Sequence, residues 1–169
     1  MKVLTVLVPT YNVEKYLRRC LDSLLLPEVL EEIEVLVVND GSKDGSADIA
    51  RAYEKKYPQT VVFVDKENGG HGSTINVGIE KAQGTYFKVL DSDDWVNIGD
   101  FIEFVKRLKE ETADAVICDY RKEHVYNGKS EYFEYKDLED GKKYNLNEID
   151  LNILHGEYFM MATTTYRTE

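Results

Sequence analysis

Apolar runs that fit buried strands alternate with helical patterns along the first 120 residues of this chain. The expected strands are Lys2–Val8, Ile33–Val38, Val61–Val64, Thr85–Leu90 and Ala113–Cys118. They are rich in valine and leucine with little polar alternation, which is typical of parallel strands covered on both faces. Apolar residues at helical spacing follow each of the first four strands, over 13–25, 47–53, 75–82 and 98–108. This alternation predicts an α/β fold, a Rossmann-like, mostly parallel sheet in a three-layer α/β/α sandwich.

The second half of the chain follows a different pattern. Residues Tyr120–Tyr126 and Lys129–Tyr135 flank Asn127 and Gly128, which predicts an antiparallel hairpin with a two-residue turn, attached to the sheet. A short helix over 146–154 and a last strand over 163–167 are expected. The sequence ends at Glu169 without a terminating signal, which suggests a piece of a longer protein.

A polar loop follows each of the first four expected strands. Because the carboxyl ends of parallel strands meet at one edge of the sheet, these loops should line a single crevice, where such sheets bind ligands. The loops are Thr10–Asn12, Asp40–Ser42, Asn68–Ser73 and Asp91–Asp94.

The loop after the fourth strand carries three carboxylates within four residues, those of Asp91, Asp93 and Asp94. Carboxylates so close together repel one another unless a cation keeps them ionised. Mg²⁺ and Mn²⁺ prefer oxygen ligands, and Mg²⁺ is commonly shared between protein carboxylates and a substrate's phosphates. One hypothesis is therefore a metal-assisted phosphate site. The alternative is an acidic turn in which one aspartate caps the helix expected near Ile98.

The other loops offer groups that suit a nucleotide. The glycine-rich stretch Asn68–Ser73 opens a helix and exposes backbone N–H groups, although its spacing is not that of the G-x-G-x-x-G fingerprint. Tyr11 could stack on a base, and Asp40 could accept a hydrogen bond from its ring N–H. A packed loop tyrosine and an Asx turn are the alternatives. His71 could donate to a phosphate or be only solvated.

Composition excludes several classes of partner. With a formal net charge of −11 and a pI near 4.8, the chain lacks the basic face that nucleic acids and anionic lipids require. No run approaches the ~20 apolar residues of a membrane span, so a cytoplasmic location is expected. Cys20 and Cys118 fall at core-facing positions and are expected to be buried free thiols.

Five motifs in this order resemble the inverting family-two glycosyltransferases of the GT-A fold. They are Val-Pro-Thr-Tyr-Asn-Val-Glu over 8–14, Val-Asn-Asp-Gly-Ser-Lys-Asp-Gly-Ser over 38–46, Asn-Gly-Gly over 68–70, Asn-Val-Gly over 76–78 and Leu-Asp-Ser-Asp-Asp over 90–94. The resemblance is close over residues 2 to 120. It implies that 1–120 form the half that binds a nucleotide sugar and 121–169 the start of a truncated acceptor-side half, within one structural domain.

The resemblance also implies a substrate, a cofactor and residue roles. The donor would be a nucleotide-diphosphate sugar, most often a uridine one, bound with Mn²⁺ or Mg²⁺, and the acceptor a saccharide or a glycolipid. The nucleotide-binding residues would be Pro9, Thr10, Tyr11, Glu14, Asp40, Asn68, Gly69, Gly70, Asp91 and Ser92. Asp93 and Asp94 would hold the metal. A longer protein of this kind could lie at the inner face of the membrane in bacterial polysaccharide or glycolipid assembly.

Two features depart from the family pattern. Ile75 stands before Asn76, where members often have an arginine that meets the diphosphate, so this contact would fall to His71, Lys88 or the metal. The catalytic base is expected beyond Glu169, and of the residues present only Glu157 and Glu169 come near its place. The chain is therefore expected to bind donor and to transfer little sugar.

Three other classes of protein carry related patterns. A phosphoaspartyl phosphatase has a strand-end Asp-x-Asp with a nucleophilic carboxylate, but after its first strand. A sugar-nucleotide pyrophosphorylase has a basic glycine-rich loop after that strand, unlike Pro9–Glu14. A non-catalytic nucleotide-binding or receiver-like module is the remaining alternative.

Overall fold

The computed structural model describes residues 1–124, 126–136, 138–145 and 161–168. The helix expected over 146–154 and the base candidates Glu157 and Glu169 lie outside the described residues.

The order of elements follows the predicted alternation. The strands are β1 (Leu4–Thr10), β2 (Ile33–Asp40), β3 (Val61–Lys66), β4 (Tyr86–Val89), β5 (Ala115–Ile117), β6 (Tyr120–His124), β7 (Lys129–Phe133) and β8 (Thr164–Arg167). The helices are α1 (Leu17–Leu24), α2 (Ser46–Lys56), α3 (His71–Lys81) and α4 (Ile98–Leu108). Within the described part of the chain, none of these helices is long and apolar enough to cross a bilayer.

Six strands form one mixed sheet in the order β3-β2-β1-β4-β8-β5. Strands β1 to β4 pair in parallel, whereas β8 pairs antiparallel with both β4 and β5. The strand order reverses direction at β1, between β2 and β4, and such a switch point opens a crevice at the carboxyl edge of the sheet. The predicted fold class is confirmed.

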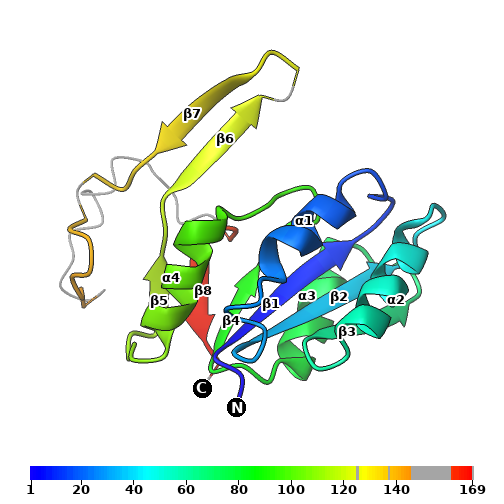
Figure 1. Cartoon of the computed structure of the whole chain (residues 1–169), viewed down its shortest axis with the longest axis horizontal. Helices are drawn as coiled ribbons and strands as arrows, with labels where there is room; N and C mark the ends of the chain where they lie inside the picture. The colour runs from blue at the N-terminus through cyan, green and yellow to red at the C-terminus, as the bar shows by residue number, and fades with distance from the viewer. Residues whose placement is uncertain (125, 137, 146–160, 169) are drawn as a thin grey trace.

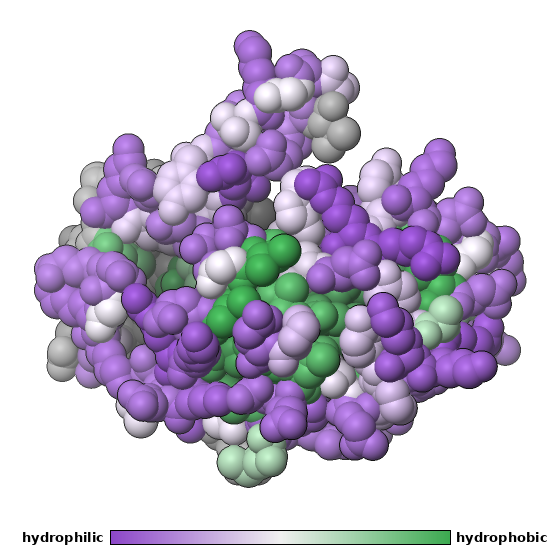
Figure 2. All heavy atoms as spheres, viewed as in Figure 1, coloured by the Kyte–Doolittle hydropathy of each residue, from purple (hydrophilic) through white to green (hydrophobic). Residues whose placement is uncertain are grey.

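The sheet is covered on both faces, as Figure 1 shows. Leu4, Val6 and Val8 of β1 point into the larger core with α1, α2 and α4, while Leu7 points into the smaller core under α3. Because neighbouring strand residues serve different cores, the strands are apolar throughout. Figure 2 shows a mostly hydrophilic surface on this side, with hydrophobic residues gathered over the region between α1 and α4.

Pro9 does not end the first strand, which continues to Thr10. Strand β2 pairs with β1 as far as Thr10, but β4 pairs only as far as Leu7. Pro9 therefore lies where β1 has a strand neighbour on one side only, a position that tolerates a missing backbone donor.

The predicted hairpin is present, but it forms a separate two-stranded sheet that projects from the main sheet (Figure 1). Its strands end at His124 and begin again at Lys129, so the connection is longer than the expected two-residue turn. At its base the rings of Tyr120 and Phe133 stack with centroids 4.7 Å apart.

Candidate functional site

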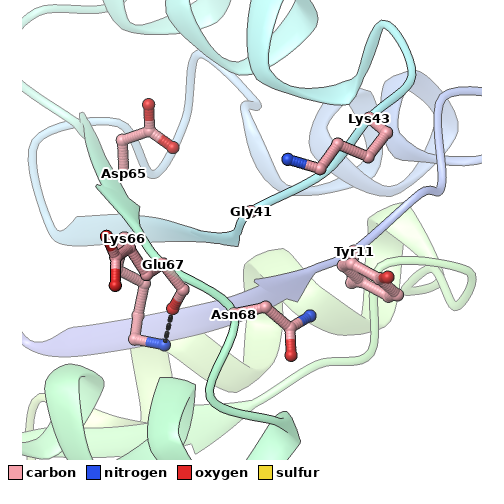
Figure 3. A pocket seen from close by; sticks show the side chains of 7 residues that line it. All are labelled: Tyr11, Gly41, Lys43, Asp65, Lys66, Glu67 and Asn68. Carbon is pink, nitrogen blue, oxygen red and sulfur yellow. Dashed lines mark hydrogen bonds between the residues drawn. The ribbon is translucent and has the colours of Figure 1, made fainter.

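A pocket of about 520 Å³ opens where the loops after β1, β2 and β3 meet. Tyr11 and Asn68 face it from the first and third loops, and Lys43 reaches into it from the second (Figure 3). Tyr11 is 51% exposed, so much of its side chain is accessible to a ligand in the pocket. The predicted convergence of these three loops is thus present in the structure.

The loops after β1 and β2 are joined by hydrogen bonds. The Asn12 N–H donates to Ser42 Oγ at 3.1 Å, and the Lys43 N–H donates to Asn12 Oδ1 at 2.8 Å. Glu14, an expected nucleotide ligand, accepts a bond from the Gly45 N–H at 2.7 Å. In this structure the Glu14 carboxylate therefore fixes the loop that carries Lys43.

The two residues before Tyr11 lie at the end of β1. Pro9 pairs with Val38 of β2, and Thr10 is buried, with its hydroxyl donating to the Val8 carbonyl at 3.1 Å. Both set the direction in which Tyr11 leaves the sheet.

Asp40, at the end of β2, is only 3% exposed and accepts bonds from three donors. Oδ1 accepts from Lys66 Nζ at 2.5 Å and from the Gly69 N–H at 2.9 Å, and Oδ2 accepts from the Gly70 N–H at 2.8 Å. Burial alone would raise the pKa of Asp40, but the bonds from Lys66, Gly69 and Gly70 together hold this pKa below its ordinary value. The carboxylate is therefore ionised and organises the glycine loop.

The glycine loop is packed closely against the end of β2. Asn68 donates from Nδ2 to the Asp40 carbonyl at 3.0 Å, and Gly41 adopts φ +72 beneath it. A Cβ on Gly69 would lie 2.8 Å from Ser73 Oγ and 3.0 Å from Lys66 Nζ, so a larger residue there would displace the side chains that hold the loop. Helix α3 begins at His71, two residues earlier than the expected end of the loop.

The aspartates after β4 form a tight turn in which the Asp94 N–H donates to the Asp91 carbonyl at 2.9 Å. Asp91 Oδ1 lies 3.3 Å from His71 Nε2, so this turn meets the glycine loop. Ser92 is buried, whereas Asp93 and Asp94 are exposed. Burial, together with the charges of Asp93 and Asp91, raises the pKa of Asp94.

None of these aspartates caps the following helix. Asn97 does so, because its Oδ1 accepts from the Gly99 and Asp100 N–H groups at 3.0 and 3.3 Å. The interpretation of the turn as a helix cap is therefore wrong.

Lys88, which was considered for the diphosphate, lies elsewhere, and the position of Ile75 explains its apolar side chain. Lys88 is 7% exposed and its ammonium donates to the Ala162 carbonyl at 2.5 Å, so it does not reach the crevice. Ile75 packs against the smaller core under α3, which explains an apolar residue at that position.

Sequence reasoning did not find Lys43 or Lys66, which line the pocket together with Gly41, Asp65 and Glu67. A single lysine carries no pattern that marks it as part of a site. Lys66 is the last residue of β3.

A mostly parallel sheet between two layers of helices, with a pocket and an aspartate turn at one carboxyl edge, defines a domain of the GT-A fold. The chain belongs to glycosyl transferase family 2, since the model of this family matches residues 5–164.

The chain is similar to larger proteins. It is 41% identical over 126 residues to EpsH of Bacillus subtilis (strain 168), covering 75% of this chain and 36% of EpsH. It is 41% identical over 98 residues to the minor teichoic acid biosynthesis protein GgaB of the same strain, covering 57% of this chain and 11% of GgaB. The crystal structure of S. aureus TarS 1–349 matches with a TM-score of 0.77 and 29% identity, covering 99% of this chain and 47% of that one. A structure of the same TarS fragment is a complex with UDP-GlcNAc, at a TM-score of 0.69 and 26% identity. The chain thus spans about a third of EpsH and about half of the TarS fragment.

Proposed function

We propose that this chain is the donor-binding part of a glycosyltransferase that uses a nucleotide-diphosphate sugar, with uridine as the nucleoside. The observation that carries the proposal is the arrangement of the crevice, with a stacking tyrosine in a pocket at one end and an aspartate turn at the other. The similarity to TarS 1–349, which has been crystallised with UDP-GlcNAc, supports the choice of uridine. The division at residue 120 into donor and acceptor halves of one domain is part of this proposal.

The base would stack on Tyr11 and meet Asp40. An ionised carboxylate has about four acceptor positions, two on each oxygen. Lys66 and Gly69 use both positions of Oδ1, and Gly70 uses one of Oδ2. One position on Oδ2 therefore remains for the ring N–H of uracil. Asn68, beside the same pocket, offers a further amide.

The aspartate turn fits a hard divalent cation. Asp93 and Asp94 offer exposed oxygen ligands, and the raised pKa of Asp94 reflects carboxylates that a nearby cation would help to ionise. The described residues contain no preformed cluster of three acidic, histidine or cysteine side chains. Asp93 and Asp94 would therefore share Mn²⁺ or Mg²⁺ with the diphosphate. When bound, the ion would stabilise the negative charge of the leaving diphosphate.

Transfer would proceed with inversion, by attack of an acceptor hydroxyl on the anomeric carbon. This attack needs a base within about 2.6 to 3.2 Å of the hydroxyl. We assign that base to no described residue, and we place it outside residues 1–169. The acceptor would be a saccharide or a lipid-linked saccharide, and the similarity to the minor teichoic acid biosynthesis protein GgaB favours a role in teichoic acid biosynthesis.

The proposal is tested by nucleotide binding, because a ligand at 100 times its Kd stabilises the folded state by about 2.7 kcal/mol. Thermal unfolding and calorimetry with UDP, UDP-GlcNAc, GDP and GDP-mannose, each with and without Mn²⁺, should show the largest stabilisation for a uridine ligand with Mn²⁺. Asp93→Asn and Asp94→Asn should remove the additional stabilisation that a nucleotide gives when Mn²⁺ is present. The control is Asp48→Asn, at a side chain 90% exposed on α2. Absence of stabilisation by every nucleotide would contradict the proposal.

The expectation about the base has its own test. The 169-residue chain should bind UDP-sugar but release sugar to water or acceptor no faster than a mixture without protein. Robust transfer by this chain would place the base within it.

A further inference from the structure

Lys43 is held in a fixed position beside Tyr11. Its N–H donates to Asn12 Oδ1 at 2.8 Å, and Asn12 follows Tyr11 directly in the chain. Asn12 adopts φ 52, a left-handed conformation that asparagine tolerates better than most residues. The Asn12 N–H donates in turn to Ser42 Oγ at 3.1 Å. The backbone of Lys43 therefore cannot move far without moving Tyr11.

The ammonium of Lys43 differs from that of Lys66, the other lysine that lines the pocket. Lys66 is paired with Asp40, and Asp65 accepts a bond from Arg51 at 2.8 Å. Among the described residues, no hydrogen bond or ion pair is made by Lys43 Nζ, although the protein carries an excess of carboxylates. Figure 3 shows this side chain extending over Gly41 into the space that Tyr11 and Asn68 also face. Its three N–H donors are available to a ligand.

The sheet order indicates which part of a nucleotide sugar lies there. The pocket is formed by the loops after β1, β2 and β3, whereas the aspartate turn follows β4 on the other side of β1. Strands β3 and β4 are three positions apart in the sheet, a separation of about 14 Å at roughly 4.8 Å per strand. With the diphosphate at the aspartate turn, the base occupies the pocket. Lys43 then faces the base rather than the phosphates.

We propose that Lys43 is a specificity residue for the donor, whose ammonium donates to a ring carbonyl oxygen of uracil stacked on Tyr11. This rests on the proposed function. Uracil carries a carbonyl on each side of its ring N–H, so a base that gives this N–H to Asp40 presents a carbonyl acceptor beside it. Lys43 and Asp40 thus read an adjacent acceptor and donor on one edge of the ring.

The test is calorimetric titration of the 169-residue chain with UMP and with UDP plus Mn²⁺. Lys43→Met should weaken both ligands by the same factor, about tenfold, because a hydrogen bond to a charged group is lost from the base. Lys43→Arg, which keeps a charged donor, should restore most of the affinity. The matched control is Lys55→Met, at an exposed lysine of α2 that does not line the pocket and gives the same change in net charge.

Two results would overturn the assignment of Lys43. Unchanged affinity of Lys43→Met for both ligands would show that the ammonium does not contact the nucleotide. If Lys43→Met loses little affinity for UMP but much affinity for UDP, Lys43 contacts the diphosphate and not the base. If the unmodified chain binds no uridine nucleotide, the proposed function itself fails, and the role of Lys43 fails with it.

Discussion

The ammonium of Lys66 lies 2.5 Å from Oδ1 of Asp40 and connects the ends of β3 and β2. The same ammonium donates to the Glu67 carbonyl at 2.6 Å and to Ser73 Oγ at 2.9 Å. All three donors of the lysine are therefore used within the protein. Lys66 thus joins two strands to the first turn of α3, and it fixes the glycine loop that separates the pocket from the aspartate turn.

Lys66→Met should destabilise the protein by about 2 kcal/mol, because it leaves the buried Asp40 carboxylate without its cation. Two backbone donors, Gly69 and Gly70, remain to that carboxylate. Urea unfolding measures the free energy of unfolding. Lys66→Arg should lose clearly less stability than Lys66→Met because it keeps a charged donor. Equal stability of Lys66→Met and the unmodified protein would mean that the lysine is not needed to hold Asp40.

Helix α1 anchors the segment that carries the aspartate turn. Arg19 Cζ lies 3.2 Å from the ring centroid of Trp95, and the Val96 N–H donates to Ser23 Oγ at 3.2 Å. Trp95 follows the turn directly, so its packing on Arg19 restrains the direction of the turn.

The contact between Arg19 and Trp95 should therefore have a measurable coupling energy. Arg19→Ala, Trp95→Leu and the double variant, compared by urea unfolding, should give a coupling of about 0.5 to 1 kcal/mol, the usual size of a partly exposed cation–π contact. If the guanidinium and the ring did not interact, the losses of unfolding free energy in the two single variants would add up to the loss in the double variant.

Much of the parallel half of the fold is predictable because its determinants are local. The apolar runs that form β1 to β4 contribute side chains to the cores on both faces of the sheet. The ends of these runs mark the positions of the glycine loop and the aspartate turn. The position of β8 between β4 and β5 is different, because it depends on long-range pairing of Thr165 with Lys88 and Val116. No local pattern in Thr164–Arg167 specifies those neighbours.

The site was predictable to a similar extent. Tyr11, Asp40 and Asn68 stand in loops of unusual composition, and the structure brings them together. Lys66 and Lys43 could not be found in this way, since a lysine is equally common on any surface. Lys88 was a reasonable hypothesis that failed, because one residue in a strand can point to the core even when the strand leads to the site.

Gly84→Ala should destabilise the protein by about 2 kcal/mol or more. A Cβ at this position would lie 2.4 Å from the Thr5 backbone nitrogen, and neither backbone can move away without disturbing β1. The control is Gly72→Ala in the first turn of α3, where an added Cβ meets nothing within 4 Å. That change should be neutral or stabilise by up to about 1 kcal/mol. Thermal and urea unfolding of both variants give the comparison, and similar effects at the two positions would contradict the packing argument.

Glu111 should make stability depend on pH in the acid range. Its Oε1 lies 2.7 Å from Lys143 Nζ and accepts hydrogen bonds from the Ala113 and Thr112 N–H groups at 2.8 and 2.6 Å. The bond from Lys143 has the largest effect on the pKa of Glu111, and together with the two backbone bonds it lowers this pKa from 4.5 to about 2. Since the folded pKa lies below the unfolded one, this stabilisation is complete above about pH 4.5 and is lost as the pH falls toward 2.

Glu111→Gln should therefore cost about 1 kcal/mol at pH 7, a value kept small by solvent screening, and progressively less between pH 4.5 and 2. Glu110→Gln, at the exposed neighbouring position, is the matched control and should change little at any pH. Urea unfolding at pH 7, 4 and 3 measures the differences. A cost for Glu111→Gln that stays constant over this range would mean that the charge of Glu111 does not stabilise the end of α4, because only an ionised carboxylate loses its advantage on protonation.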